Sequence, residues 1–307
     1  MGQKGFKTVK EQITTLEQRG VSFSDREAAG RFLLKESYYV VVNGYKEAFI
    51  DKQASNLAGE DRYREGTSFD QFVALYRFDS ALRRETMDII LKAESAMKTA
   101  TVHAFCDVHR DADAYLDPMC YCRKDDYKPS EKYTSSLIRL LSTLQGVHDN
   151  KLRKRYIKHY LDKHRCVPLW VAAKCLTFGN MSAFFDLQTQ AVKTKSCANL
   201  ARALGKKSVK QRQLAYAYHT LPEFRNICAH DERLYCTKVG KNEDKGFAEL
   251  LRSLSTVTEE GELAAFASKV AVLVEHAEEE GEEFKKMVCS GLGVDVAKLR
   301  EIADAMQ

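Results

Sequence analysis

One long helical pattern constrains the fold of this chain more than any other feature. From 69 to 107 the apolar residues recur at helical spacing, and Ser68-Phe69-Asp70-Gln71 forms a capping box before them. Proline and glycine, which interrupt helices, number only 4 and 16 in 307 residues. Because so few breaks are available, we expect an all-α fold.

Further helices follow from the same kind of pattern. The segment 36–50 is ambiguous, and we favour a helix broken near Asn43-Gly44, with Tyr38, Tyr39 and Tyr45 used for packing. The segment 108–132 holds two of the prolines and several aspartates and is predicted to be a loop. The other helices are predicted at 8–19, 24–36, 133–146, 149–163, 168–177, 180–190, 196–204 and 208–220, with two or three more after a connector at 240–246.

Three local signals give predicted helix boundaries near the C-terminal half. Pro222 favours a helix start just before residue 225, because proline suits the first helical position. Breaks are predicted at Gly261 and at Ser290-Gly291.

The charge of the chain is unevenly distributed. The net charge is +5, but residues 259–283 carry nine acidic side chains against Lys269, which leaves the remainder strongly basic. A basic body suits a polyanionic partner on one face, whereas ordinary solvated helix faces would give the same numbers. No apolar run reaches transmembrane length, and the nine cysteines are scattered through helical patterns. We therefore expect a cytoplasmic protein with reduced thiols and no membrane association.

The stretch RNICAHDERLY at 225–235 is the strongest candidate for chemistry. Asn226 and His230 are four residues apart, so a helix would place them on one face. A histidine can act as general base or acid near neutral pH, an arginine can hold a phosphate bidentately, and Asn226 can orient the imidazole ring or hydrogen-bond the phosphate. With Arg225, these groups suffice to cleave RNA without a metal, by attack of a 2′-hydroxyl on the adjacent phosphate. The products would be a 2′,3′-cyclic phosphate and a 5′-hydroxyl. A helix cap with a hydrogen-bonded histidine explains the same residues equally well at this point.

The order of several short motifs resembles a known family. Arg225-Asn226-x-x-Ala229-His230 followed by Arg233-Leu234-Tyr235 resembles the motif of HEPN-domain ribonucleases. The rest of the pattern is similar to the Abi-D/Abi-F-like abortive-infection proteins of bacterial phage defence. It spans roughly 8–236 and includes Tyr38-Tyr39, Gly44-Tyr45, Arg77-Phe78-Asp79, Leu82-Arg83, Glu94, Pro168-Leu169-Trp170 and Phe178-Gly179.

The resemblance implies a fold, an activity and partners. The fold would be a HEPN-type helical bundle with helical extensions: an N-terminal segment at 1–66, a catalytic domain at 67–238 and an acidic C-terminal extension at 239–307. The activity would be that of a metal-independent endoribonuclease that arrests growth or aborts phage infection, with no cofactor and no metal. Because HEPN motifs commonly face each other in pairs and this chain has one, the resemblance implies a homodimer with a composite site. A structured non-coding RNA could be a regulator as well as a substrate.

Other residues are expected to support the motif, and three positions depart from the family pattern. Asp79, Arg83 and Glu94 on the long helix are expected to form an ion-pair network that orients the site, with Arg233 beside it. The departures are Lys98 where arginine is common, Lys174 where glutamate is usual, and Cys236 where asparagine is usual.

Two basic segments are candidate RNA-binding residues. The first segment, in which tyrosines interleave, offers Lys151, Arg153, Lys154, Arg155 and Lys158 as expected RNA contacts. The second segment, just before the motif, offers Lys206, Lys207, Lys210 and Arg212. A solvated helix face is the competing interpretation. The Cys120-Tyr-Cys122 spacing does not fit a zinc knuckle. A second hypothesis for the whole chain is a non-catalytic RNA-binding module that regulates, or is regulated by, a non-coding RNA or a partner protein.

Overall fold

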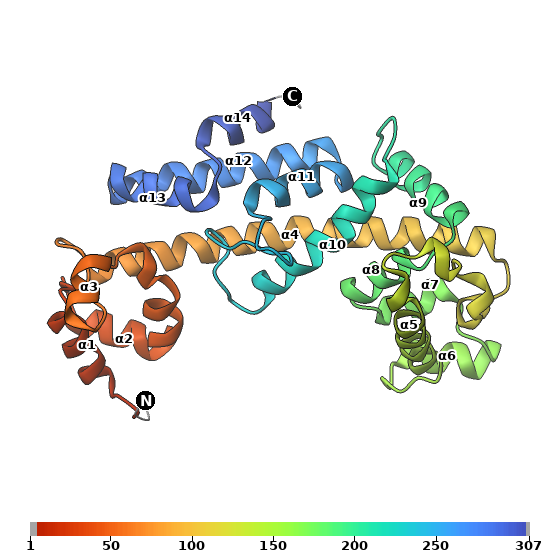
Figure 1. Ribbon diagram of the computed structural model, residues 1–307, viewed down its shortest axis with the longest axis horizontal. Coiled ribbons are helices and arrows are strands. Elements are labelled where there is room, and N and C mark those ends of the chain that lie inside the picture. Colours follow the sequence, from red (N-terminus) through yellow and green to blue (C-terminus); the bar gives the residue numbers. More distant parts are fainter. Residues whose placement is uncertain (1–4, 305–307) are drawn as a thin grey trace. The chain divides into compact units, whose positions relative to one another are not determined.

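The computed structural model describes residues 5–304, and most of these residues are helical (Figure 1). The described residues contain no strand, only isolated bridges such as that between Ser22 and Ser68. Within this range no helix is both long enough and apolar enough to cross a membrane. The prediction of an all-α fold is therefore confirmed.

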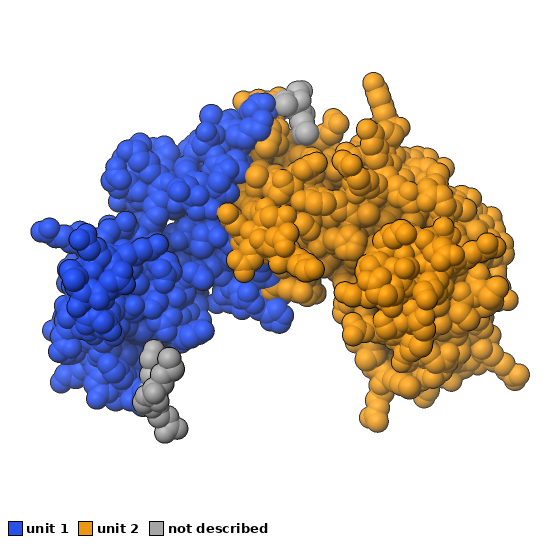
Figure 2. Space-filling model, in the orientation of Figure 1, with its two compact units in different colours: residues 1–85, 227–237, 268–301 blue, residues 86–226, 238–267, 302–307 orange. Residues whose placement is uncertain are grey.

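The described chain divides into two compact units (Figure 2). Unit 1 takes in the residues up to 85 together with 227–237 and 268–301; unit 2 takes in 86–226, 238–267 and the residues from 302 onward. These limits differ from the boundaries predicted at 66 and 238, because each unit combines segments that are far apart in the sequence.

Unit 1 contains three N-terminal helices, the beginning of the long helix α4, and C-terminal helices. Thr8 and Glu11 form a capping box at α1, and the Asp25 side chain caps α2. Ser24, the residue before this cap, donates a hydrogen bond to Asp70 at 2.6 Å. Its helices are α1 (Val9–Gln18), α2 (Arg26–Glu36), a π-helical turn (Tyr39–Asn43), a 3₁₀ turn (Lys46–Ala48), α3 (Lys52–Ala58), the first part of α4 (Phe69–Val108), the end of α12 (Glu260–His276), a 3₁₀ turn (Ala277–Glu280), α13 (Glu282–Leu292) and most of α14 (Val296–Asp304).

Unit 2 contains the rest of α4 and the helices that follow it. The segment 108–132, predicted to be a loop, has only short 3₁₀ turns. These turns are Ala114–Leu116, Pro118–Cys120, Lys124–Asp126 and Ser130–Lys132. The helices are α5 (Tyr133–His148), α6 (Arg155–His164), α7 (Leu169–Ala172) with a 3₁₀ turn (Ala173–Cys175), α8 (Phe178–Asp186), α9 (Gln190–Ala203), most of α10 (Gln211–Ala229), α11 (Phe247–Val257) and the first part of α12.

The long helix α4 begins where its capping box predicts. The Gln71 N–H donates to Ser68 Oγ at 3.3 Å, and the Ser68 N–H donates to the Gln71 side chain at 3.1 Å. Phe72, Leu75 and Leu82 are fully buried in unit 1, at the spacing that indicated a helix. The predicted limits of 69 and 107 agree with Phe69–Val108.

The helix boundary predicted at Pro222 is wrong. Pro222 lies inside α10, which runs without interruption from Gln211 to Ala229. A proline inside a helix removes one backbone hydrogen bond, but the neighbouring Leu221 and Phe224 are fully buried. Their packing maintains the helix through the proline.

The breaks predicted at Gly261 and at Ser290-Gly291 are also wrong. Gly261 lies in the first turn of α12, and Ser290-Gly291 lies inside α13. The actual breaks around α13 are Gly281 and Gly293, which have φ of +108° and +66°. These positive angles favour glycine. Gly291, in contrast, has no positive φ and lies within the helix.

Candidate active site

The Arg-Asn-His motif lies at the end of α10. Arg225 and Asn226 occupy the last turns of this helix, and His230 is the first residue after its end at Ala229. Asn226 and His230 are both exposed. Ile227 is buried in the same turn, so burial of this side chain fixes which face of the helix end is presented to solvent.

The turn after α10 ends the helix without using the motif side chains. The Glu232 N–H donates to the Ile227 carbonyl at 3.1 Å, which is the backbone bond of a Schellman cap. Asp231 has a left-handed φ of +57°, which aspartate tolerates better than most residues. Because backbone atoms satisfy the helix end, the His230 ring is not needed as a cap.

Arg225 and His230 have few structural contacts. The Arg225 Nε atom is buried and has no hydrogen-bond partner among residues 5–304, and its Nη1 donates to Asn226 Oδ1 at 3.5 Å. Neither Arg225 nor His230 forms an ion pair within the described part of the chain. A buried guanidinium N–H without an acceptor is costly unless a ligand supplies one. Arg225 is thus suited to bind an anion.

Arg83 holds the turn that follows His230. In unit 1, its guanidinium donates to the Asp231 carboxylate and, at 3.2 Å, to the Glu232 carbonyl. Arg83 is almost completely buried, with 4% of its side chain exposed. A planar guanidinium with several fixed donors can hold two acceptors at once, so Arg83 fixes the left-handed conformation of Asp231.

Asp79 holds the next two residues by their backbone. Its carboxylate accepts hydrogen bonds from the Leu234 N–H at 3.0 Å and the Tyr235 N–H at 2.8 Å. It also forms an ion pair with Arg83 at 2.9 Å. Burial raises the pKa of the Asp79 carboxyl, and Arg83 and the Leu234 N–H counteract this effect. The carboxylate with its donors therefore anchors 231–235 to α4.

Tyr45 joins this network, although the sequence predicted only a packing role. Its hydroxyl donates to Asp79 at 2.8 Å and accepts from Arg83 at 3.1 Å. Its ring stacks on Tyr235 with centroids 6.2 Å apart. A buried tyrosine hydroxyl requires a partner, but the burial of Tyr45 follows from tertiary contacts and cannot be read from its neighbours in the sequence. Tyr39 is 74% exposed, so the packing role predicted for it is wrong.

The C-terminal helix α13 also contacts the segment that follows the motif. A Cβ atom on Gly291 would lie 2.5 Å from Tyr235 Cδ2, closer than real Cβ contacts. Glycine at this position therefore allows α13 to approach the Tyr235 ring. The residues beyond 239 thus have a structural connection to the motif that their sequence did not indicate.

Cys228, the thiol within the motif, is unsuited to nucleophilic chemistry. Burial raises the pKa of this thiol to about 12, so it is protonated at neutral pH. Within residues 5–304, no three histidine, cysteine, aspartate or glutamate side chains are grouped so as to hold a metal ion.

The remaining expected supporting residues lie outside the Asp79 network. Glu94 pairs with Lys98 at 3.4 Å in unit 2, and Lys98 also donates to the Leu176 carbonyl at 2.9 Å. Arg233 is exposed, and only its carbonyl accepts a bond, from Thr237. Of the expected network, the structure thus brings together Asp79 and Arg83 but not Glu94.

Two departures from the family pattern have local explanations. The Lys174 ammonium lies over the Tyr156 ring, 5.8 Å from its centroid, so this lysine makes a cation–π contact between the 3₁₀ turn after α7 and α6. Cys236 is partly buried beside Tyr235, and burial raises its pKa. Among residues 5–304, neither side chain hydrogen-bonds to Asp79 or Arg83.

The expected RNA-binding residues are at the surface of unit 2, with one exception. Lys206 is partly buried and donates to the Ser255 carbonyl at 2.5 Å. The first group extends from the turn before α6 into that helix, and the second extends from the connector after α9 into the first turn of α10. The exposed residues are Lys151, Arg153, Lys154, Arg155, Lys158, Lys207, Lys210 and Arg212.

The fold and site define an all-helical protein with one Arg-x4-His motif, followed by a segment, 231–235, that a buried acid–arginine pair holds on α4. Comparison with known proteins identifies its family: the model of the Abi-like protein family matches residues 31–236. The chain therefore belongs to the Abi-like protein family. No curated protein and no solved structure matches it.

Proposed function

We propose that this protein is a metal-independent endoribonuclease of the HEPN type that acts in abortive-infection defence. The observation that carries the proposal is that Arg225 and His230 have no carboxylate partner among the described residues, although a buried network fixes the chain beside them. A buried guanidinium N–H normally has an acceptor, so the unpaired Nε of Arg225 beside an anchored turn favours a role toward a ligand.

The chemistry assigns a task to each motif residue. His230 removes the proton from the 2′-hydroxyl, and the resulting oxygen attacks the adjacent phosphorus. Arg225 stabilises the charge that develops on the non-bridging oxygens, and Asn226 orients the phosphate or the ring. The bond from phosphorus to the 5′ oxygen breaks, and a second acid protonates that oxygen. The products are a 2′,3′-cyclic phosphate and a 5′-hydroxyl.

The need for a second acid favours a homodimer. The chain has one complete motif, and His230 can supply the base but not simultaneously the acid. A second copy would supply it through its own His230 in a composite site. A cyclic C2 pair is the commonest way in which two identical surfaces associate.

The test is RNA cleavage by matched variants in the presence of EDTA. We expect Arg225→Ala and His230→Ala to abolish cleavage, with helical circular dichroism unchanged. Arg252→Ala is the control, because this exposed arginine on α11 lies outside the motif. Cleavage that persists in both motif variants would refute the proposed roles, and loss of activity in EDTA would indicate a metal enzyme.

The alternative is a non-catalytic module that binds RNA, such as a structured regulatory non-coding RNA. The variant His230→Ala separates the two functions. A nuclease should retain bound RNA when its base is removed, whereas a binding module should never produce fragments with 5′-hydroxyl ends. RNA bound but uncut by the unmodified protein, including during phage infection, would favour the binding module.

A further inference from the structure

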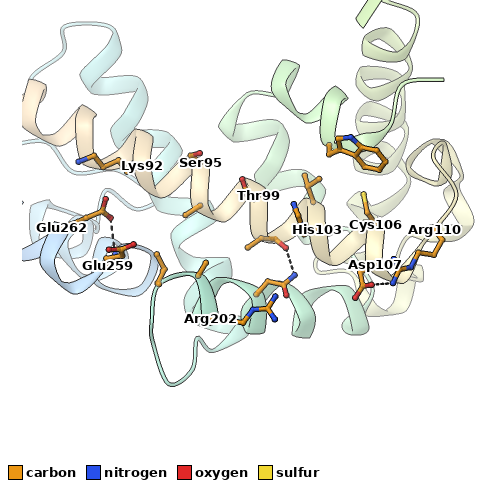
Figure 3. Close-up of a pocket in the computed structure, with 17 residues that line it drawn as sticks. Lys92, Ser95, Thr99, His103, Cys106, Asp107, Arg110, Arg202, Glu259 and Glu262 are labelled. Carbon is orange, nitrogen blue, oxygen red and sulfur yellow. Dashed lines mark hydrogen bonds and ion pairs between the residues drawn. The ribbon is translucent and has the colours of Figure 1, made fainter. Parts of the chain in front are cut away.

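Unit 2 has a large groove along α4 that the motif does not use. Its volume is about 1220 Å³, and Trp170 from α7 is part of its lining. Figure 3 shows Ser95, Thr99 and His103 following one another along α4 in this groove, with Arg202 on α9 as a further lining residue. The groove therefore exposes both an aromatic ring and a guanidinium.

A second, smaller cavity meets this groove at Arg202. Its volume is about 700 Å³, and it lies between α9 and the start of α10. Its charged lining residues are Arg202, Lys206 and Lys207, and its described lining includes no carboxylate. Three cations around one cavity without an anion favour a polyanionic ligand.

Two of these cations are free of protein partners. Neither Arg202 nor Lys207 forms an ion pair or a side-chain hydrogen bond within residues 5–304, and both are exposed. Lys206 is already hydrogen-bonded to Ser255, and burial lowers the pKa of its ammonium. Arg202 and Lys207 are therefore the groups available to a ligand.

Trp170 is the only tryptophan in the chain, and 55% of it is exposed. An indole usually lies mostly buried, because its large apolar surface is costly to hydrate. An exposed ring at the edge of a groove offers a flat surface on which a nucleic-acid base can stack.

The acidic residues of the larger groove leave only part of it open to a polyanion. Asp107 is paired with both Arg110 and Lys195, so its charge is neutralised. The other two carboxylates, Glu259 and Glu262, lie together near Lys92 and away from Arg110 (Figure 3). Negative charge is thus concentrated at one end of the groove.

We propose that these two cavities form a binding track for single-stranded RNA, with phosphates at Arg202 and Lys207 and a base stacked on Trp170. The identity of the strand as RNA rests on the proposed function, whereas the track itself rests on the charges, the cavities and the exposed ring. The residues at this track differ from the motif residues, so binding and cleavage can be tested separately.

Because Trp170 is the only tryptophan, its fluorescence reports directly on the track. The experiment uses the full-length His230→Ala variant and a single-stranded oligonucleotide of about 12 nucleotides, within the range of known single-strand sites. We expect saturable quenching of the fluorescence as RNA is added. RNA binding is also followed separately with a labelled copy of the oligonucleotide. Trp170 fluorescence that does not change while this labelled RNA binds would overturn the role of Trp170.

Affinity of the labelled RNA tests the three contacts together. The substitution Trp170→Ala, which removes the stacking ring, should weaken RNA binding by about tenfold. The pair Arg202→Ala/Lys207→Ala should make the negative slope of log affinity against log salt shallower by about 1.4, since each single-strand phosphate contact contributes about −0.7. The control pair Lys10→Ala/Lys52→Ala removes the same charge from exposed positions on α1 and α3 and should leave the slope unchanged.

The outcomes distinguish this proposal from the proposed function. RNA that is cut normally and binds equally well to the Arg202→Ala/Lys207→Ala variant would refute the track and leave the ribonuclease intact. RNA that quenches Trp170 in a protein that never cuts it would support the track and refute the ribonuclease. Absence of RNA binding, with self-association lost in Trp170→Ala, would show that a second copy occupies the groove and would refute the track.

Discussion

The Asp79 carboxylate holds the Tyr235 backbone N–H at 2.8 Å, across 156 positions of the sequence. Asp79 is completely buried, and its neighbour Arg83 binds the Asp231 side chain one residue after His230. These contacts anchor the end of the motif segment to α4 within unit 1. They make the orientation of that segment depend on one buried acid–base pair.

Asp79→Asn should therefore destabilise the protein by about 3 kcal/mol, because an amide cannot accept from all of the present donors and leaves a buried charge less well paired. Urea unfolding measures this change. Asp88→Asn is the matched control: Asp88 also pairs with a cation four residues later on α4, but is 61% exposed. Its loss should cost about 0.5 kcal/mol or less. Equal effects of the two substitutions would show that the Asp79 network contributes no more than a surface pair.

Gly291→Ala should destabilise unit 1 by about 1–3 kcal/mol, because the new Cβ would overlap the Tyr235 ring. Hydrogen exchange should also become faster at the backbone N–H of Tyr235, whose partner is Asp79. The matched control is Gly261→Ala in α12, where nothing lies within 4 Å. This change should stabilise the helix by about 0.5–1 kcal/mol. An increase in the free energy of unfolding for both Gly291→Ala and Gly261→Ala would show that α13 does not pack closely against Tyr235.

The ion pair between His219 and Asp186 in unit 2 should make stability depend on pH. Their atoms lie 3.1 Å apart, and the hydrogen bond to Asp186 raises the pKa of His219. A raised folded pKa gives stability that is complete below the unfolded value of about 6.5 and is lost as pH rises through the folded value. The free-energy difference between the unmodified protein and His219→Ala should thus be largest near pH 5.5 and decline toward pH 9. His159→Ala, at an exposed histidine without an ion pair among residues 5–304, should show no such trend.

A composite site makes a quantitative prediction for mixed dimers. If each site needs two intact motifs, His230→Ala subunits mixed equally with unmodified ones should reduce total activity to about one quarter, assuming random exchange within C2 pairs. Activity that falls only in proportion to the unmodified subunits, to about one half, would indicate that each copy cleaves RNA alone.

The helical fold could be predicted because its signals are local. The capping box at Ser68 and the apolar spacing along α4 are properties of neighbouring residues, and both agree with the structure. The boundary predicted at Pro222 is wrong because burial of the neighbouring Leu221 and Phe224 overrides the local preference of proline. Gly291 is the clearest case, since its small size serves a contact with Tyr235 that no local pattern reveals.

The candidate site was predictable in its motif but not in its surroundings. Asp79 and Arg83 lie four apart on one helix, so their pairing could be expected from sequence. The contributions of Tyr45 and the backbone N–H of Tyr235 could not, because they depend on tertiary contacts. Arg202 was also missed, because only the cavity around it distinguishes it from other exposed arginines.

The most direct test of the central claim is the chemistry of the cut itself. The unmodified protein is incubated in EDTA with an RNA that it cleaves, and with the same RNA carrying a 2′-deoxynucleotide immediately 5′ of the scissile phosphate. The mechanism assigned to Arg225 and His230 predicts 2′,3′-cyclic phosphate and 5′-hydroxyl ends from the first RNA and no cleavage of the second at that position. Cleavage of the 2′-deoxy RNA at that bond, or fragments with 5′-phosphate ends, would contradict it.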